Sequence, residues 1–228
     1  MIQARSTWQR GQLGLTLFFI LCSVAACTQA HGQADKTVPA FTGPASSAGS
    51  GEQTAVLAGG CFWGVDAVFK HVRGVSQVVS GYAGGSAETA TYELVSTGGT
   101  GHAESVQITF DPSRISYAQL LHIFFAVAHD PTQVGGQGPD MGSQYRSAIF
   151  FTTADQRETA QAYIDQLNRA NVFPKPIATE VVPLKKFYPA EAYHQDYLAQ
   201  HPENPYIVFN DLPKLAELQA QFPTMYHQ

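Results

Sequence analysis

The residues best suited to chemistry form one run, Gly60-Cys61-Phe62-Trp63-Gly64. A short apolar strand expected over residues 54–58 leads into two glycines, and a helix expected over residues 62–71 begins beside the cysteine. The unpaired amides of a helix's first turn stabilise negative charge, and this favours the nucleophilic thiolate form of a cysteine. The neighbouring aromatic rings could wall an apolar pocket, and the glycines would let a substrate approach the backbone. A buried structural cysteine is the alternative, and these neighbours disfavour it.

Composition and charge limit the possible classes of function. The chain has 228 residues, of which 44% are hydrophobic and 11% aromatic, enough to bury one core. A formal net charge of −5 and the lack of a Lys/Arg cluster argue against a nucleic-acid partner. No histidine pair has the i,i+4 spacing of a zinc site, and there is no glycine-rich nucleotide loop. The sequence therefore predicts neither a metal nor a cofactor.

The first 26 residues have the pattern of an export signal. Arg5 and Arg10 precede an apolar run over residues 13–26, which is too short for a comfortable membrane span. The run ends in two alanines before Cys27, as in a bacterial lipoprotein signal whose cysteine is lipidated. We expect residues 1–26 to be a lipoprotein signal peptide, so that the exported protein is anchored to a bacterial membrane and faces the periplasm or the cell exterior. An ordinary secretory signal that is cut nearby is the alternative.

The three cysteines of the chain have different expected fates. Cys22 leaves with the signal peptide, and Cys27 is blocked if it carries lipid. Cys61 is then the only free thiol of an exported protein. An unpaired cysteine in an oxidising compartment is either reactive or deeply buried.

The rest of the chain divides into a linker and one domain. Residues 27–53 are rich in Gly, Ser, Ala, Thr and Gln and are expected to form a flexible tether, which leaves residues 54–228 as the catalytic domain. Strands are expected over residues 54–58, 75–81, 104–110, 147–152 and 179–183, and helices over residues 62–71, 90–96, 116–128, 153–170 and 189–200. This order favours an α+β fold, a two-layer sandwich with helices on one face of a mostly antiparallel sheet.

Several motifs give the domain a family resemblance. With the run around Cys61 they are Gly81-Tyr82-Ala83-Gly84-Gly85, Thr91-Tyr92-Glu93, Thr100-Gly101-His102-Ala103-Glu104, Phe110-Asp111-Pro112, His129-Asp130-Pro131, Gln144-Tyr145-Arg146-Ser147, Tyr193-His194-Gln195 and Asn204-Pro205-Tyr206. In type and order they resemble the peptide-methionine (S)-S-oxide reductases, MsrA. The resemblance extends from residue 54 to the C-terminus. It implies a ferredoxin-like core, a monomer, and oxidised proteins and free methionine sulfoxide as substrates.

The resemblance also implies roles for five residues around the sulfur. Cys61 would attack the sulfoxide sulfur and pass through a sulfenic acid, and Phe62 and Trp63 would hold the methyl group. Asp140 matches an acidic position near the thiol, and His194 matches a position that borders the site.

Three further residues would act on the sulfoxide oxygen. The resemblance implies that Glu104 gives this oxygen a proton and that Tyr92 and Tyr145 donate hydrogen bonds to it. Oxygen is a poor leaving group, so a proton donor and hydrogen-bond donors must meet the charge that develops on it. A carboxyl group that is neutral at pH 7 needs a raised pKa, which desolvation by an apolar wall supplies.

The sequence departs from many relatives in its lack of resolving cysteines. Residues 209–228 contain none, and Ser96 stands where some relatives have cysteine. An outside thiol, either a small molecule or a thioredoxin-like protein, is therefore the expected reductant. Two other classes of function stay open at this point. One is a thiol peroxidase or cysteine hydrolase that pairs Cys61 with His102 or His194, and the other is a surface lipoprotein that binds methionine-rich partners.

Overall fold

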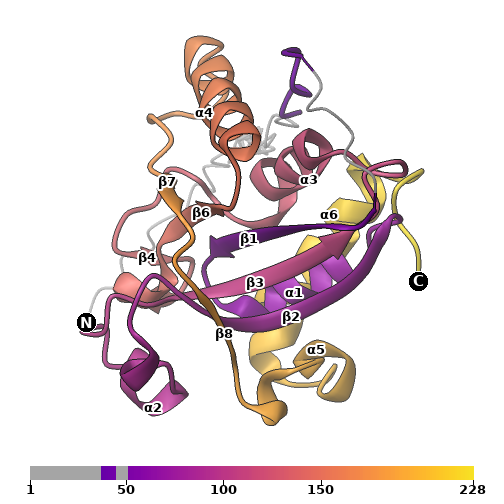
Figure 1. Ribbon diagram of the computed structural model, residues 1–228. Helices are drawn as coiled ribbons and strands as arrows, with labels where there is room; N and C mark the ends of the chain where they lie inside the picture. Colours follow the sequence, from indigo (N-terminus) through magenta and orange to yellow (C-terminus); the bar gives the residue numbers. More distant parts are fainter. Residues whose placement is uncertain (1–36, 45–50) are drawn as a thin grey trace, which may run out of the picture. The chain divides into compact units, whose positions relative to one another are not determined.

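The computed structural model describes residues 37–44 and 51–228. The expected signal peptide and the lipidation site Cys27 lie outside the described residues. The strands are β1 (Gln53–Gly59), β2 (Val75–Ala83), β3 (Ala103–Phe110), β4 (Gly136–Gln137), β5 (Asp140–Met141), β6 (Ser147–Phe151), β7 (Glu180–Pro183) and β8 (Phe187–Pro189). The α-helices are α1 (Phe62–Lys70), α2 (Tyr92–Val95), α3 (Tyr117–Ile123), α4 (Ala154–Arg169), α5 (Tyr197–Gln200) and α6 (Leu212–Gln221). Figure 1 shows their arrangement.

Six strands form the main sheet, in the order β7-β6-β1-β3-β2-β8. All neighbours pair antiparallel except β6 and β7, which are parallel. The four long strands of the chain are β1, β2, β3 and β6. Within this sheet they lie side by side in the order β6-β1-β3-β2, which is the ferredoxin-like arrangement. The predicted α+β fold with a mostly antiparallel mixed sheet is therefore confirmed.

The sheet is strongly curled, and the link between its two edge strands shows why. The chain passes from Pro183, the end of β7, to Phe187, the start of β8, in four residue steps. Four steps reach at most about 14 Å, whereas the edges of a flat six-stranded sheet lie about 24 Å apart. The sheet must therefore bend until its edges approach each other, and the β7–β8 link crosses its concave side (Figure 1).

Alternation along β1 builds two cores. Ala55 and Leu57 face the main core, which they share with residues of α1, α3, α4 and α6. Val56 and Ala58 face a smaller cluster on the other side, beside Phe187 of β8. Successive strand residues point to opposite faces, so β1 is buried on both sides and reads as a continuous apolar run. The end of β1 is thus a rigid support for the residues that follow it.

Near the C-terminus one helix prediction was wrong and one helix was missed. The helix expected over residues 189–200 is instead the end of β8, a 3₁₀ turn over Ala192–His194 and the four-residue α5. Asp196 separates the turn from α5 with a left-handed backbone, φ 55°, which no continuous helix allows. The following helix, α6, was missed, although Pro213 in its first turn is a helix-start signal.

The helix expected over residues 116–128 is confirmed in part. Ser116 caps α3 through a capping box with Gln119. After Ile123 the helix widens into a π-helical turn, Phe124–Ala128. This turn places His129 against Gly59, the last residue of β1. Within residues 37–44 and 51–228, no helix is long and apolar enough to cross a membrane.

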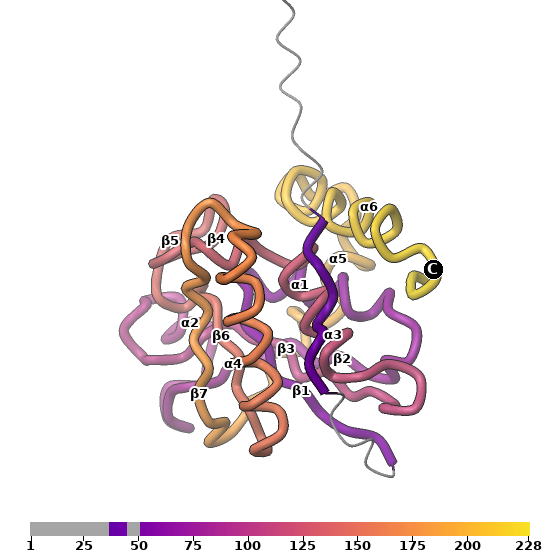
Figure 2. The backbone as a smooth tube through the Cα atoms, turned by 90° about the horizontal axis from the view of Figure 1, so that it is seen from above, coloured from indigo at the N-terminus to yellow at the C-terminus, as the bar shows by residue number. Residues whose placement is uncertain are grey.

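Residues 37–44, which we call the N-terminal strap, are docked on the domain. Figure 2 shows the strap, in indigo, running beside α3. Val38 is only 3% exposed and belongs to the main core. Side chains of the helices donate to three successive strap carbonyls: His122 Nε2 to Val38, Tyr163 OH to Pro39 and Gln166 Nε2 to Ala40. Over this stretch the expected flexible tether is corrected to a bound segment.

Candidate active site

Cys61 lies at the junction of β1 and α1, at the N-cap of the helix. Its own side chain does not cap the helix. The cap comes from a distant strand, because Oε2 of Glu104 on β3 accepts a hydrogen bond from the Phe62 amide at 3.0 Å. The carboxyl group is therefore fixed at the positive end of α1, next to the thiol.

The glycines beside Cys61 make room for the protein's own side chains. Gly60 has φ +93°, and a Cβ there would lie 2.6 Å from Cγ of Gln137. A Cβ on Gly64 would lie 2.1 Å from Oδ1 of Asp211. The expected role of these glycines in the approach of a substrate is corrected, because packing against the protein's own side chains requires them.

The thiol is harder to ionise than expected. Burial raises the pKa of Cys61 well above its ordinary value, and the nearby Glu104 and Asp211 raise it further. The Trp63 amide at the helix N-terminus lowers this pKa, but the effect is smaller. The expectation that the helix end makes Cys61 a ready thiolate is thus corrected.

The Glu104 carboxyl group has the protonation that a proton donor needs. It is only 3% exposed, and burial raises its pKa to about 8, against the opposing hydrogen bond from the Phe62 amide. The carboxyl group is therefore largely neutral at pH 7. A neutral acid can give a proton to a developing oxyanion, as the sequence analysis required.

Two tyrosines share this electrostatic environment. Burial raises the pKa of Tyr92 and of Tyr145, and in both cases the next causes are Glu104 and Cys61. Tyr92 begins α2 and its amide donates to Oε1 of Glu191 at 2.9 Å, whereas Tyr145 lies in a 3₁₀ turn before β6. The structure thus brings together the four residues that the sequence separated by up to 84 positions, from 61 to 145.

The aromatic wall is more extensive than the sequence indicated. The indole of Trp63 stacks on Tyr197 with 3.6 Å between centroids and 4° between planes. Trp63 Nε1 donates to Nδ1 of His194 at 3.2 Å, and the His194 ring lies 5.0 Å from that of Phe62. His194 therefore positions both wall residues. Tyr197 was missed, because nothing in its sequence neighbourhood distinguishes it from an ordinary helix residue.

A pocket of about 210 Å³ lies beside the thiol. Its lining includes Cys61, Asp140, Tyr206 and Lys214. The Tyr206 hydroxyl donates to Oδ2 of Asp140 at 2.5 Å, and burial together with Cys61 and Asp140 raises the pKa of Tyr206. Asp140 is thus near the thiol, as expected. Tyr206 was noticed only as part of a motif, although that motif was the signal that could have placed it in the site.

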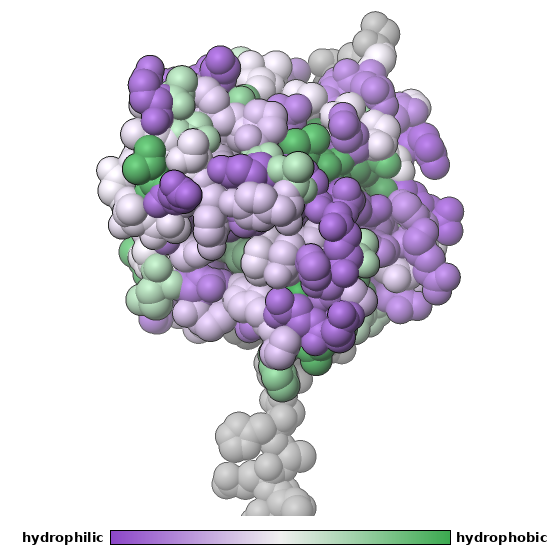
Figure 3. All heavy atoms as spheres, turned by 90° about the horizontal axis from the view of Figure 1, so that it is seen from below, coloured by the Kyte–Doolittle hydropathy of each residue, from purple (hydrophilic) through white to green (hydrophobic). Residues whose placement is uncertain are grey.

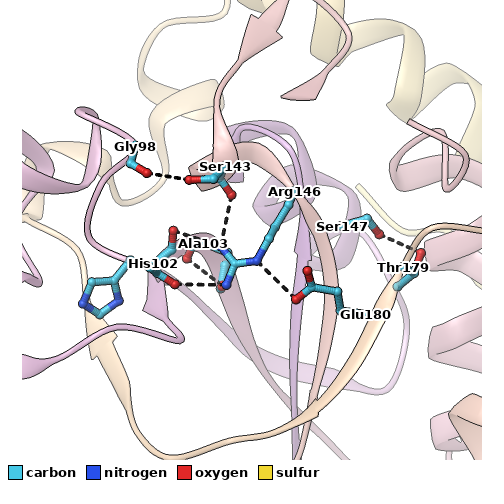
Figure 4. Close-up of polar contacts among 10 residues, drawn as sticks. Gly98, His102, Ala103, Ser143, Arg146, Ser147, Thr179 and Glu180 are labelled. Atoms are coloured by element: carbon cyan, nitrogen blue, oxygen red, sulfur yellow. Dashed lines mark hydrogen bonds and ion pairs between the residues drawn. The ribbon is translucent and has the colours of Figure 1, made fainter. Parts of the chain in front are cut away.

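Arg146 ties two parts of the site together. Its guanidinium donates to the carbonyls of Gly101, His102 and Ser143 at 3.0 to 3.1 Å, and it pairs with Glu180 at 3.4 Å. Figure 4 shows these contacts converging on one side chain.

The position of Arg146 gives these contacts a meaning for the chemistry. Arg146 follows Tyr145 directly, and the carbonyls that it binds end two residues before Glu104. Arg146 therefore fixes the positions of Tyr145 and Glu104 relative to each other. A Cβ on Gly84 would lie 2.9 Å from the guanidinium, so a glycine is needed there.

Comparisons with known proteins agree with this geometry. A family model described as peptide methionine sulfoxide reductase matches residues 53–225. The chain belongs to the peptide methionine sulfoxide reductase family. A family member from Mesorhizobium japonicum is 58% identical over 181 residues, 79% of this chain and 93% of the relative. One from Thermus thermophilus is 53% identical over 174 residues, 76% of this chain and 97% of the relative.

Solved structures support the same assignment. Methionine sulfoxide reductase A of Corynebacterium diphtheriae is 35% identical and has a TM-score of 0.58, covering 68% of this chain and 78% of its own. The reduced form of Mxr1 from Saccharomyces cerevisiae is 33% identical and has a TM-score of 0.62, covering 73% of this chain and 94% of its own. The activity of the chain is accordingly the reduction of methionine sulfoxide.

The contacts of His102 argue against its role as the base of a cysteine hydrolase. Nδ1 of His102 accepts from the Gly85 amide, and its Nε2 faces the Ser86 carbonyl at 2.9 Å. Both nitrogens are engaged by backbone, so His102 has none left to activate Cys61. His194 uses Nδ1 to accept from Trp63.

Proposed function

We propose that this reductase acts on the S epimer of methionine sulfoxide, in proteins and as the free amino acid, through a sulfenic acid on Cys61. The observation that carries the proposal is the buried, largely neutral Glu104 carboxyl group bound at the N-terminus of α1, next to the thiol. Such a donor serves a substrate whose oxygen must gain a proton as its bond to sulfur breaks.

The geometry supports one orientation of the substrate. The methyl group rests against Phe62 and Trp63, and the oxygen faces Glu104 and the two tyrosines. In the other epimer the methyl group and the oxygen exchange places, so that an apolar group would meet the hydrogen-bond donors. Buried donors left without a partner are costly, and this cost disfavours the R epimer.

The reaction balances with the groups present. The Cys61 sulfur bonds to the sulfoxide sulfur, and the sulfoxide oxygen takes up the thiol proton and the Glu104 proton, so that it leaves as water when the sulfur–oxygen bond breaks. A water oxygen then bonds to the Cys61 sulfur and returns one proton to Glu104, while the sulfur–sulfur bond breaks with its electron pair passing to methionine, which departs and leaves Cys61 as a sulfenic acid. The cysteine is oxidised by two electrons and the substrate is reduced by two.

The second half of the cycle needs an external thiol. Within the described residues Cys61 is the only cysteine, and Ser96 stands on the surface where some relatives carry another. One outside thiol attacks the sulfenic acid with loss of water, and a second resolves the mixed disulfide. A small thiol or a thioredoxin-like protein fills this role.

A single-turnover experiment tests the proposal. Reduced mature protein receives one equivalent of pure S or R methionine sulfoxide without reductant. With the S epimer we expect one methionine, a mass gain of about one oxygen, and labelling of Cys61 by a dimedone-type probe. The Cys61→Ser variant should give none of these. Equal yields from both epimers would reject the stereochemistry, and loss of two hydrogens within one chain would reject the external thiol.

We also propose that the mature protein is a monomer anchored to a membrane through lipidated Cys27. The two alanines before Cys27 and the charged, apolar leader support this. The Cys27→Ala variant should then lose membrane attachment or fail to mature. A wild-type protein that is soluble with an unmodified N-terminus would contradict the anchor, and light scattering of detergent-solubilised protein would test the monomer.

A further inference from the structure

A second hollow lies beside the active-site pocket. We call it the side groove; it has a volume of about 590 Å³ and is lined by Asp130, Thr132, Gln133, Val134, Gly136, Gly138, Met141 and Lys175. Val134 is 83% exposed and Met141 is 75% exposed. Large apolar side chains are rarely that exposed in the described part of the chain, whose surface is mostly hydrophilic on the face in Figure 3. The side groove is therefore an unusual surface.

The side groove is continuous with the pocket that Cys61 lines, which we call the thiol pocket. Asp130 and Gly138 line both hollows. Gly138 lies in the turn between β4 and β5, and Met141 follows Asp140 directly, so one short hairpin carries a wall of each. A chain whose methionine sulfoxide reaches Cys61 can continue from the pocket over this hairpin.

The polar groups of the side groove are mostly engaged in holding its loop. Oδ1 of Asp130 accepts from the amide and the hydroxyl of Thr132, and Oε1 of Gln133 accepts from the Gly138 amide at 2.7 Å. Lys175 has no ion pair with any residue in the described part of the chain. The surface on offer is therefore two apolar side chains and one cation.

We propose that the side groove binds the polypeptide chain next to the methionine sulfoxide. An apolar side chain of the substrate lies against Val134 and Met141, and an acidic one faces Lys175. The inference rests on the proposed function. Continuity with the thiol pocket favours this occupant, because a chain already held by its sulfoxide gains the extra contacts with little further loss of freedom.

The test compares substrates with and without a flanking chain, with dithiothreitol as reductant. One heptapeptide carries leucine and glutamate beside a methionine S-sulfoxide, a second carries serine and glutamine there, and N-acetylmethionine S-sulfoxide amide has no chain. For Val134→Ser we expect kcat/KM on the first peptide to fall about three- to tenfold. The amide and the second peptide should be unchanged. Lys175→Gln should act only on the peptide with glutamate.

A matched control comes from an exposed apolar residue outside the side groove. Phe209 is 77% exposed and follows Tyr206 by three residues, but it does not line the side groove. Phe209→Ser should leave all three substrates unchanged. Both serine substitutions are at exposed positions, where stability changes little.

Three other results would overturn the inference. Equal losses of kcat/KM on the amide and on the first peptide would show that Val134 supports the catalytic site and does not bind the flanking chain. Unchanged kinetics on all substrates would show that the side groove is unused. An effect seen only when thioredoxin replaces dithiothreitol would assign the side groove to the reductant. Failure of the wild-type protein on all three substrates, by contrast, would reject the proposed function.

Discussion

The catalytic centre and the N-terminal strap treat buried polar groups in opposite ways. In the centre, Oδ2 of Asp211 and Nε2 of His194 are buried without a hydrogen-bond partner among the described residues, and Glu104 is buried although it is ionisable. In the strap, three successive carbonyls each accept from a helix side chain. An unsatisfied buried polar group costs about 1–3 kcal/mol, whereas a satisfied hydrogen bond contributes about 1 kcal/mol.

The difference shows where the fold gains stability and where it gives stability up. The pKa shift that suits Glu104 to its proposed role arises from burial that disfavours its charged form. The hydrogen bonds of these three strap carbonyls come from side chains of α3 and α4. Substitutions in the two regions should therefore separate activity from stability.

The largest expected effect is that of Glu104→Gln. Single-turnover reduction should slow about 10²- to 10⁴-fold, because general acid help is lost. Wild-type single-turnover rates should fall above about pH 8, where Glu104 ionises, and the variant should lack this inflection. Alkylation of Cys61 at pH 7 is the control and should change little. An unchanged single-turnover rate would remove Glu104 from its role.

The same substitution should reveal what Glu104 costs the fold. Its pKa rises from 4.5 to about 8 on folding, so the folded state binds the proton more tightly than the unfolded state does. The contribution of this group to stability is present below about pH 4.5 and is lost as pH rises to about 8. The stability of Glu104→Gln relative to the wild type should therefore increase across this range and then level off, as denaturant titrations can show.

A smaller effect is expected for Arg146, which positions the site without touching the substrate. Arg146→Ala should lower kcat about 10- to 100-fold, because Tyr145 and Glu104 lose their common register. Arg146→Lys should recover only part, since an ammonium cannot reproduce the forked contacts. Glu180→Gln removes only the half-exposed ion pair and should be nearly neutral. A rise in KM alone, with kcat unchanged, would contradict this assignment.

The smallest effect on activity is expected in the strap. Val38→Ala should lower the free energy of unfolding by about 1–2 kcal/mol, because it removes buried methyl groups. Thr37→Ala, at an exposed neighbour, is the control and should change the free energy of unfolding by less than about 0.5 kcal/mol. Chemical denaturation measures both, and kcat/KM should stay constant. A parallel loss of activity would show that the strap also supports the catalytic centre.

The sequence predicted the parts of the molecule that depend on local pattern. The apolar run before Cys61, the capped helix at Ser116 and the alternation along β3 gave the order of elements, and family resemblance supplied the positions of Glu104 and the tyrosines. The helix expected through Asp196 is wrong because the left-handed backbone of this single residue interrupts it.

What could not be predicted depends on contacts between distant segments. Asp211 affects the thiol only because α6 packs against α1, and Tyr206 reaches Asp140 across 66 positions. The pKa of Cys61 is a balance between a helix end and burial, and sequence shows only the first. The strap was missed because the composition of residues 27–53 suggests a linker, while much of its binding uses backbone carbonyls, which carry no sequence signal.

The stacked wall of the site has an optical consequence. The chain has two tryptophans, Trp8 and Trp63, and the first lies in the expected signal peptide. Indole emission from a mature protein would then come from Trp63 alone, the ring that is stacked on Tyr197 and bonded to His194. Because the proposed methyl contact falls on this same ring, the fluorescence of Trp63 should change when the substrate binds.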